Sequence, residues 1–315
     1  MTSLHEKVLL GDVRSAARLM RLVDDDFDSA IEEMKALYPC TGKAAIIGVT
    51  GNPGAGKSTL VDRIIQRYRA KGRKVGVVAI DPTSPFSGGA IMGDRVRMGR
   101  HFEDEGVFIR SLATRGHLGG LSKSTAEVVR VMEAWGADPV IVETVGVGQA
   151  EVDVVKAAQT SVVVTVPGLG DEIQAIKAGI MEIADIFVVN KADRPGADRA
   201  LKDIEEMLQL VMPEGADPWV PKILPVVAFR DEGIDALVEA IEAHREWLVR
   251  TGYMEERSRR RAELQFFDLL HDRFKRRVKE MLSAGEFQSW NEDLLRGRKD
   301  PYTLAESIEG RLLKE

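Results

Sequence analysis

The sequence is poor in the residues that build disulfides and metal clusters. Of its 315 residues one is cysteine, Cys40, and five are histidine. A single thiol excludes a disulfide within the chain and a cysteine-rich metal site. The histidines lie far apart in the sequence, so a cluster of histidines that collects a metal ion is disfavoured as well.

Long apolar runs and an excess of positive charge are also missing. No run approaches the roughly 20 apolar residues that span a bilayer, and residues 1–7 show no secretory pattern. The net charge of −6 disfavours a general surface for nucleic acid. We therefore expect a cytoplasmic protein with neither a membrane nor a nucleic acid as its partner. If the chain is the processed form of a longer precursor, a location in the mitochondrial matrix remains an alternative.

Strands and helices alternate between residues 44 and 250. Runs rich in valine and isoleucine predict strands at residues 44–50, 74–80, 107–111, 139–144, 161–166, 186–190 and 223–227. Helical patterns cover residues 123–135, 150–158, 171–183 and 199–211. Continuous apolar runs are typical of strands buried on both faces of a largely parallel sheet. We expect a doubly wound α/β domain that binds its ligand at the carboxyl ends of its strands.

Helical extensions are expected on both sides of this domain. Residues 1–43 predict an N-terminal helical extension that packs on the domain. Residues 251–315 predict a helical arm, with apolar side chains and one histidine spaced alternately by three and four at Leu264, Phe267, His271, Phe274, Val278 and Met281. That spacing is typical of paired helices, and it favours a homodimer over a helix that docks on its own domain.

A phosphate-binding loop follows the first predicted strand. It reads Gly51-Asn52-Pro53-Gly54-Ala55-Gly56-Lys57-Ser58-Thr59, which is glycine, four residues, then Gly-Lys-Ser. Glycines let backbone N–H groups curl around phosphate oxygens, and the next helix adds the positive end of its dipole. Lys57 can place its charge between the β- and γ-phosphates, while Ser58 can bind Mg²⁺.

A second motif, Asn190-Lys191-Ala192-Asp193, ends a predicted strand and indicates guanine. The Asp193 carboxylate can accept hydrogen bonds from N1–H and the 2-amino group, a donor pair that adenine lacks. Asn190 can contact the O6/N7 edge, and the Lys191 stem can cover the ring. The third base loop is expected at Val227-Ala228-Phe229, where the Ala228 N–H is available for guanine O6.

Acidic residues flank the expected phosphate site. Asp81, Asp94 and Glu143 are candidate magnesium ligands together with Ser58, because Mg²⁺ prefers oxygen ligands. Either aspartate could instead cap a helix. Lys57, Asp94 and Glu143 are the candidate catalytic residues, and the Gly146 N–H is placed to read the γ-phosphate.

No arginine is obvious as a catalytic finger. Arg95, Arg97, Arg110 and Arg115 are candidates, but each could equally pair with an acid. A phosphate-loop GTPase without a finger is slow, which favours a switch over a metabolic hydrolase.

Together these segments resemble the MeaB/ArgK family of GTPases, which includes the methylmalonic aciduria type A protein. The resemblance covers nearly the whole chain, with matching segments at the phosphate loop and at residues 81–98, 114–122, 143–151, 166–180, 190–193 and 300–303. Residues 143–149 and the loop at 88–94 are far more specific than the phosphate loop. It implies GTP hydrolysis coupled to protection, reactivation or cofactor loading of an adenosylcobalamin-dependent acyl-CoA mutase, and a homodimer built by C-terminal helices. A cobalamin adenosyltransferase is a further candidate partner.

The same resemblance implies a third switch at residues 168–177. Its polar members are Asp171, Gln174 and Lys177, which would signal to the mutase. Direct cobalamin binding is not expected, because the chain has no Asp-x-His-x-x-Gly motif. One departure from the pattern is the third base loop, where Val227 stands in place of the usual serine.

Two other functions stay open at this point. A GTPase that delivers a metal such as nickel would need a cluster of histidine and cysteine, which the sequence does not offer. A GTPase that regulates another protein partner would show the same nucleotide motifs.

Overall fold

The computed structural model describes residues 2–81, 99–101, 103–113, 124–144, 157–168, 184–210, 217–282 and 284–312. The side chains of Asp81, Ala284, Phe287, Asn291 and Leu312 are not described. Contacts divide the chain into two compact units, Met1–Ser258 and Arg259–Glu315. The domain boundaries predicted from the sequence lie after residues 43 and 250.

Seven parallel strands form one sheet in the first unit. They are β1 (Ile46–Gly51), β2 (Val75–Asp81), β3 (Val107–Ala113), β4 (Val140–Thr144), β5 (Thr160–Thr165), β6 (Ile186–Asn190) and β7 (Lys222–Val226). Their order across the sheet is β3-β2-β4-β1-β5-β6-β7, and each pairing is parallel. The strands begin and end within two residues of the predicted runs, which confirms the doubly wound parallel sheet.

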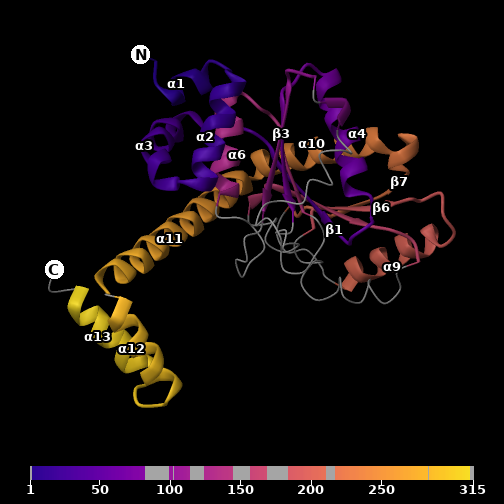
Figure 1. Cartoon of the computed structure of the whole chain (residues 1–315). Coiled ribbons are helices and arrows are strands. Elements are labelled where there is room, and N and C mark those ends of the chain that lie inside the picture. Colours follow the sequence, from indigo (N-terminus) through magenta and orange to yellow (C-terminus); the bar gives the residue numbers. More distant parts are fainter. Residues whose placement is uncertain are drawn as a thin grey trace. The chain divides into compact units, whose positions relative to one another are not determined.

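Helices cover both faces of this sheet (Figure 1). One face packs against α4 (Lys57–Ala70) and α10 (Ile234–Thr251). The other face packs against α6 (Thr125–Trp135) with the N-terminal helices, and, at its β6 side, against α9 (Ala197–Leu210). Strand β2 is apolar on both faces of the sheet. Val75 and Val77 pack in the core beneath α4 and α10, while Val78 and Ile80 pack in the core beneath α6 and the N-terminal helices. Two predicted helices are thus confirmed, those at 123–135 and 199–211.

The N-terminal extension is helical, as predicted. It contains α1 (Leu4–Leu9), α2 (Val13–Asp25), α3 (Phe27–Leu37) and a short 3-10 turn, Tyr38–Cys40. Gly11, with φ +85°, separates the first two helices, and the Asp12 carboxylate caps the second by accepting from Ser15 N at 2.7 Å. The Trp135 indole of α6 donates to Gly11 O at 3.0 Å, which ties the extension to the sheet domain.

A buried polar cluster fixes the start of the long helix α11 (Tyr253–Met281). Arg257 donates to both carboxylate oxygens of Asp185, at 2.9 and 3.1 Å. His244 Nε2 of α10 lies 3.2 Å from the same carboxylate. Burial alone would raise the pKa of Asp185, but the hydrogen bonds from His244 and Arg257 hold the pKa below its usual range. Because Asp185 immediately precedes β6, this strand runs from the root of α11 to the guanine motif.

The second unit is helical. It contains the rest of α11, then α12 (Ala284–Leu295) and α13 (Pro301–Leu312), and the predicted helix at 257–281 is confirmed. Three of the predicted seam residues, Leu264, Phe267 and Phe274, are 44%, 56% and 52% exposed. Among the described residues, none of the helices is both long enough and apolar enough to span a bilayer.

Candidate nucleotide-binding site

The phosphate loop occupies the turn between β1 and α4, where sheet packing requires glycine. Gly51 ends β1 with φ +134°, and a Cβ there would lie 2.0 Å from Val164 O of the neighbouring strand. Gly56 has φ +88°, and its Cβ would lie 2.5 Å from Asn190 Nδ2. Both contacts are closer than atoms tolerate, so the loop backbone can follow this path only with glycine at these two positions.

The Lys57 side chain points back into the loop. Its Nζ donates to Gly51 O at 2.5 Å and to Asn52 O at 2.9 Å, and the residue is only 6% exposed. These carbonyl groups hold the ammonium group above the N-terminus of α4. A phosphate group in the loop would therefore meet a positive charge that is already positioned.

Ser58 and Glu143 join the phosphate loop to the carboxyl end of β4. Ser58 Oγ donates to Glu143 Oε1 at 2.7 Å, and both residues are buried. A second bond, from Thr144 Oγ1 to Thr50 Oγ1 at 3.0 Å, fixes the same two strand ends. The loop and the acid predicted from separate segments of the sequence are thus in direct contact.

This pair has the donor chemistry that Mg²⁺ requires. A serine hydroxyl that donates to a carboxylate still has lone pairs to offer, and a carboxylate is a typical oxygen ligand of this cation. Ser58 and Glu143 would hold the ion, which would neutralise charge on the phosphate oxygens. Among the described residues, no group of three or more histidine, cysteine, aspartate or glutamate side chains could hold a metal ion.

Several predicted residues fall where the structure gives no description. Asp81 ends β2, but its side chain is not described. The remaining predicted residues of the switch segments lie outside the described residues: Asp94, Gly146, Asp171, Gln174 and Lys177. The helices predicted at residues 150–158 and 171–183 fall there too, apart from 157–158. Their roles stay predictions.

Asn190 connects the base side of the site to the phosphate loop. Its Nδ2 donates to Ala55 O at 2.7 Å, and its Oδ1 accepts from Ala228 N at 3.1 Å. The side chain is 2% exposed, so this buried amide orders both loops at once. The Ala228 N–H, predicted to serve guanine O6, has Asn190 as its partner in this structure.

Lys191 and Asp193 lie in the turn after β6. Lys191 has φ +57°, and its Nζ donates to Gly54 O at 2.7 Å, so its stem passes toward the phosphate loop. Asp193 Oδ2 lies 3.6 Å from Arg230 Nη2. The Arg230 guanidinium thus lies beside the carboxylate that is predicted to accept two hydrogen bonds from guanine.

The third base loop forms a short 3-10 turn, Ala228–Arg230, directly after β7. Val227 N donates to Glu232 O at 3.1 Å and so closes the turn. Ala228 is buried, whereas the Phe229 side chain is 72% exposed. The structure brings this loop, the motif at 190–193 and the phosphate loop together at one edge of the sheet, as predicted for parallel strands.

Two arginines of α4 that contact this loop were not predicted from the sequence. Arg63 donates to two of its carbonyl groups, and Arg67 binds Asp231 and Asp235. The hydrogen bond to Asp235 raises the pKa of the Arg67 guanidinium above its ordinary value. Their spacing of four residues, matched by the spacing of Asp231 and Asp235, is the signal that could have indicated such pairing.

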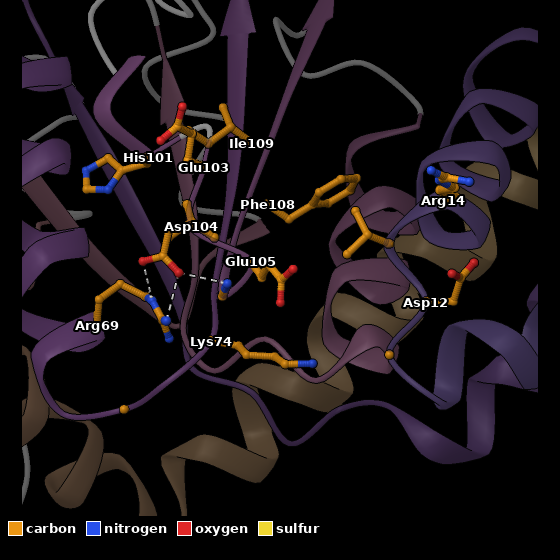
Figure 2. A pocket seen from close by; sticks show the side chains of 15 residues that line it. Asp12, Arg14, Arg69, Lys74, His101, Glu103, Asp104, Glu105, Phe108 and Ile109 are labelled. Atoms are coloured by element: carbon orange, nitrogen blue, oxygen red, sulfur yellow. Dashed lines mark hydrogen bonds and ion pairs between the residues drawn. The ribbon is translucent and has the colours of Figure 1, made fainter.

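An open groove of about 1190 Å³ lies elsewhere, between α2 and the start of β3 (Figure 2). It is lined by residues of 11–14 and 103–109 together with Arg69, Gly72, Lys74 and His101. Arg69 and Asp104 pair with each other here at 2.8 Å. Residues before β3 lie at the amino end of the sheet, so this groove is separate from the nucleotide site.

The parallel sheet, the phosphate loop that leads into α4 and the guanine motif after β6 define the class of P-loop GTPases. The sequence profile of the family described as "Methylmalonyl Co-A mutase-associated GTPase MeaB" matches residues 16–283. The chain belongs to this family of GTPases.

Individual relatives agree with this assignment. A protein of Pyrococcus abyssi is 49% identical over 306 residues, which are 97% of this chain and 94% of that protein. The GTPase ArgK of Escherichia coli is 36% identical over 78% of this chain and 76% of its own length. The mouse protein "Methylmalonic aciduria type A homolog, mitochondrial" is 32% identical over 72% of this chain and 55% of its own length. The crystal structure of an LAO/AO transport system kinase superposes with a TM-score of 0.70 at 26% identity, covering 98% of this chain and 96% of that one.

Proposed function

We propose that this chain is a slow GTPase switch that acts as a chaperone of an adenosylcobalamin-dependent acyl-CoA mutase such as methylmalonyl-CoA mutase. The bond between Ser58 and Glu143, at 2.7 Å, carries the proposal for the nucleotide site, because it joins the phosphate loop to an acid at a strand end. The family description supports the proposal for the partner, because it names a mutase.

Each described residue has a definite task in this proposal. Lys57 binds the β- and γ-phosphates, and Ser58 with Glu143 holds the cation against the same oxygens. Asp193 selects guanine, while Asn190 keeps the base loop and the phosphate loop in register through its two bonds. Hydrolysis at the γ-phosphate can then alter the conformation of the loops that contact this phosphate, and the partner would respond to that change of conformation.

A low intrinsic rate is part of the proposal. Of the four arginines considered as a finger, only Arg110 belongs to the described residues, and it lies 3.8 Å from Asp24 of α2. Its charge is thus directed to the N-terminal helices. A GTPase without an arginine in place gains rate when a partner orders the site, which fits regulation by a bound mutase.

The partner is tested by measuring GTP turnover with and without a purified acyl-CoA mutase from the same source. We expect the mutase to raise the rate severalfold, because a bound partner can order the catalytic site of a slow GTPase. Phosphate release is the measurement, and an equal concentration of serum albumin is the control. The Lys177→Ala variant should lose more of the stimulation than of the basal rate.

An unchanged rate, together with mutase binding that is absent or independent of the nucleotide, would contradict the chaperone role and leave the GTPase alone. A cobalamin adenosyltransferase as a further partner and a cytoplasmic location rest on the sequence, and both stay predictions. No cobalamin site of the chain's own is part of the proposal.

Pairing of two chains through α11 is also proposed. The predicted seam includes Leu264, Phe267 and Phe274, each more than 40% exposed. A second copy of the helix would cover these side chains, and burying the exposed half of each one favours association by about 1 kcal/mol. The seam spacing and the exposure of its apolar members support the same homodimer.

A charged residue in the seam should separate the dimer. We expect the Phe267→Asp, Phe274→Asp double variant to be a monomer by light scattering at concentrations where the unaltered chain is a dimer. The matched control is Lys275→Asp, an exposed position next to the seam, which should leave the mass unchanged. A double variant that stays dimeric would place the interface elsewhere.

A further inference from the structure

The third base loop is held from outside by helix α4. Arg63 Nε donates to Ala228 O at 3.1 Å, and its Nη2 donates to Phe229 O at 3.3 Å. The Arg63 side chain is 19% exposed; its bond to Ala228 O is partly buried, whereas its bond to Phe229 O is exposed. One guanidinium group therefore sets the direction of two successive carbonyl groups in the loop.

A second arginine, one helical turn further along, holds the end of the same loop. Arg67 Nη1 lies 3.0 Å from Asp231 Oδ2, and its Nε lies 2.7 Å from Asp235 Oδ1. Asp231 has φ +65°, an uncommon backbone conformation for a residue with a side chain. The two arginines thus fix the loop from its 3-10 turn to the start of α10.

The orientation of these carbonyl groups decides where the loop's N–H groups point. In a trans peptide the C=O and the following N–H are antiparallel, so the two carbonyl groups held by Arg63 turn the N–H groups of Phe229 and Arg230 away from α4. The Arg230 N–H donates to Val227 O within the turn, at 2.9 Å. On the opposite side of the loop, Ala228 N is bonded to Asn190 Oδ1. Ala228 is therefore held between α4 and the guanine motif.

We propose that Arg63 is a positioning residue for guanine recognition, which orients the third base loop in place of the serine that this loop lacks. The inference rests on the proposed nucleotide site. Val227 has no side-chain hydrogen-bonding group, so the loop cannot be ordered by a hydroxyl group of its own. The donors of Arg63 supply two charge-assisted hydrogen bonds instead.

The test compares the dissociation constants of GDP and ADP by calorimetry in the unaltered chain and in Arg63→Ala. We expect the variant to bind GDP about tenfold more weakly, since the base loop loses the two hydrogen bonds that orient it and must be ordered at the expense of binding free energy. ADP gains nothing from the base loop, so its affinity should change little. The preference for GDP over ADP should fall by the same factor as the affinity for GDP.

Two further variants separate positioning from a general loss of structure. Arg69→Ala removes the same charge from the same helix, but Arg69 binds Asp104 at 2.8 Å, far from the base loop, so the preference should stay unchanged. Arg63→Lys keeps the charge but has one nitrogen for two carbonyl groups, and it should restore part of the preference.

Kinetics provide a readout that a merely structural role would not give. For Arg63→Ala, the KM for GTP should rise about tenfold while kcat changes by less than about twofold, because the disturbed loop contacts the base and not the reacting phosphates. An unaltered chain that does not bind GDP would overturn the proposed function itself. If the unaltered chain prefers GDP and Arg63→Ala keeps the same preference, only the positioning role is overturned. The same holds if Arg63→Ala lowers kcat and the affinity for GTP together.

Discussion

Replacing Lys57 by alanine is expected to remove GTP hydrolysis and to weaken GTP binding severely. The Lys57 ammonium group is buried and already directed into the phosphate loop by Gly51 O and Asn52 O. Charge that develops on the phosphate oxygens would lose its nearest fixed counter-charge, and removal of one such donor lowers kcat by about 10²–10³-fold. Phosphate release and calorimetry with a non-hydrolysable GTP analogue measure the two effects.

The control for this variant lies at the other end of the same helix. Lys71 caps α4 at its C-terminus and is exposed, so Lys71→Ala removes the same charge without touching the loop and should leave turnover unchanged. A Lys57→Ala protein with near-normal kcat would show that residues 51–59 are not the phosphate site.

The sheet could be predicted from the sequence because its strands are buried on both faces. Runs such as residues 186–189 are apolar without interruption, which distinguishes them from the amphipathic helices between the strands. The phosphate loop could be predicted for a different reason, since its glycines occupy positions whose backbone conformation requires glycine. Gly51 and Gly56 both have positive φ, and such a requirement is visible in the sequence itself.

Contacts between distant segments could not be predicted in the same way. The spacing of Arg63 and Arg67 indicates that they share a face of the helix, but only the folded chain shows that their partners are 164 to 168 residues away. The bond between Ala228 N and Asn190 was missed because the two loops were assigned separately to the guanine base. Motifs indicate which groups meet a ligand, but not which groups hold the motifs in place.

The cluster around Asp185 could not be predicted for a similar reason. It shows that β6 has polar contacts at both of its ends. At its start, Asp185 binds Arg257 at the root of α11. At its end, Asn190 bonds the phosphate loop and the third base loop. Strand β6, which pairs with β5 and β7, thus connects the root of the proposed dimerisation helix to the residues proposed to select the base. Such a connection is one physical route for coupling between the two.

Replacing Asp193 by asparagine is expected to change the preferred nucleotide from GTP to XTP. The carboxylate can accept from both N1–H and the 2-amino group of guanine, whereas an amide presents one acceptor and one donor. Two hydrogen bonds to a charged acceptor would be lost or mismatched, which should weaken GTP binding by on the order of a hundredfold. Xanthine carries a carbonyl group where guanine has its 2-amino group, so the amide donor then finds an acceptor.

Calorimetry with GDP and XDP measures this exchange, and Asp198→Asn is the matched control. Asp198 lies exposed in the first turn of α9, five residues from Asp193, so its substitution changes the net charge equally without altering the base site. Arg230, 3.6 Å from Asp193, would remain in both variants. If Asp193→Asn kept full affinity for GDP, the carboxylate would not read the base, and the proposed selectivity for guanine would require another residue.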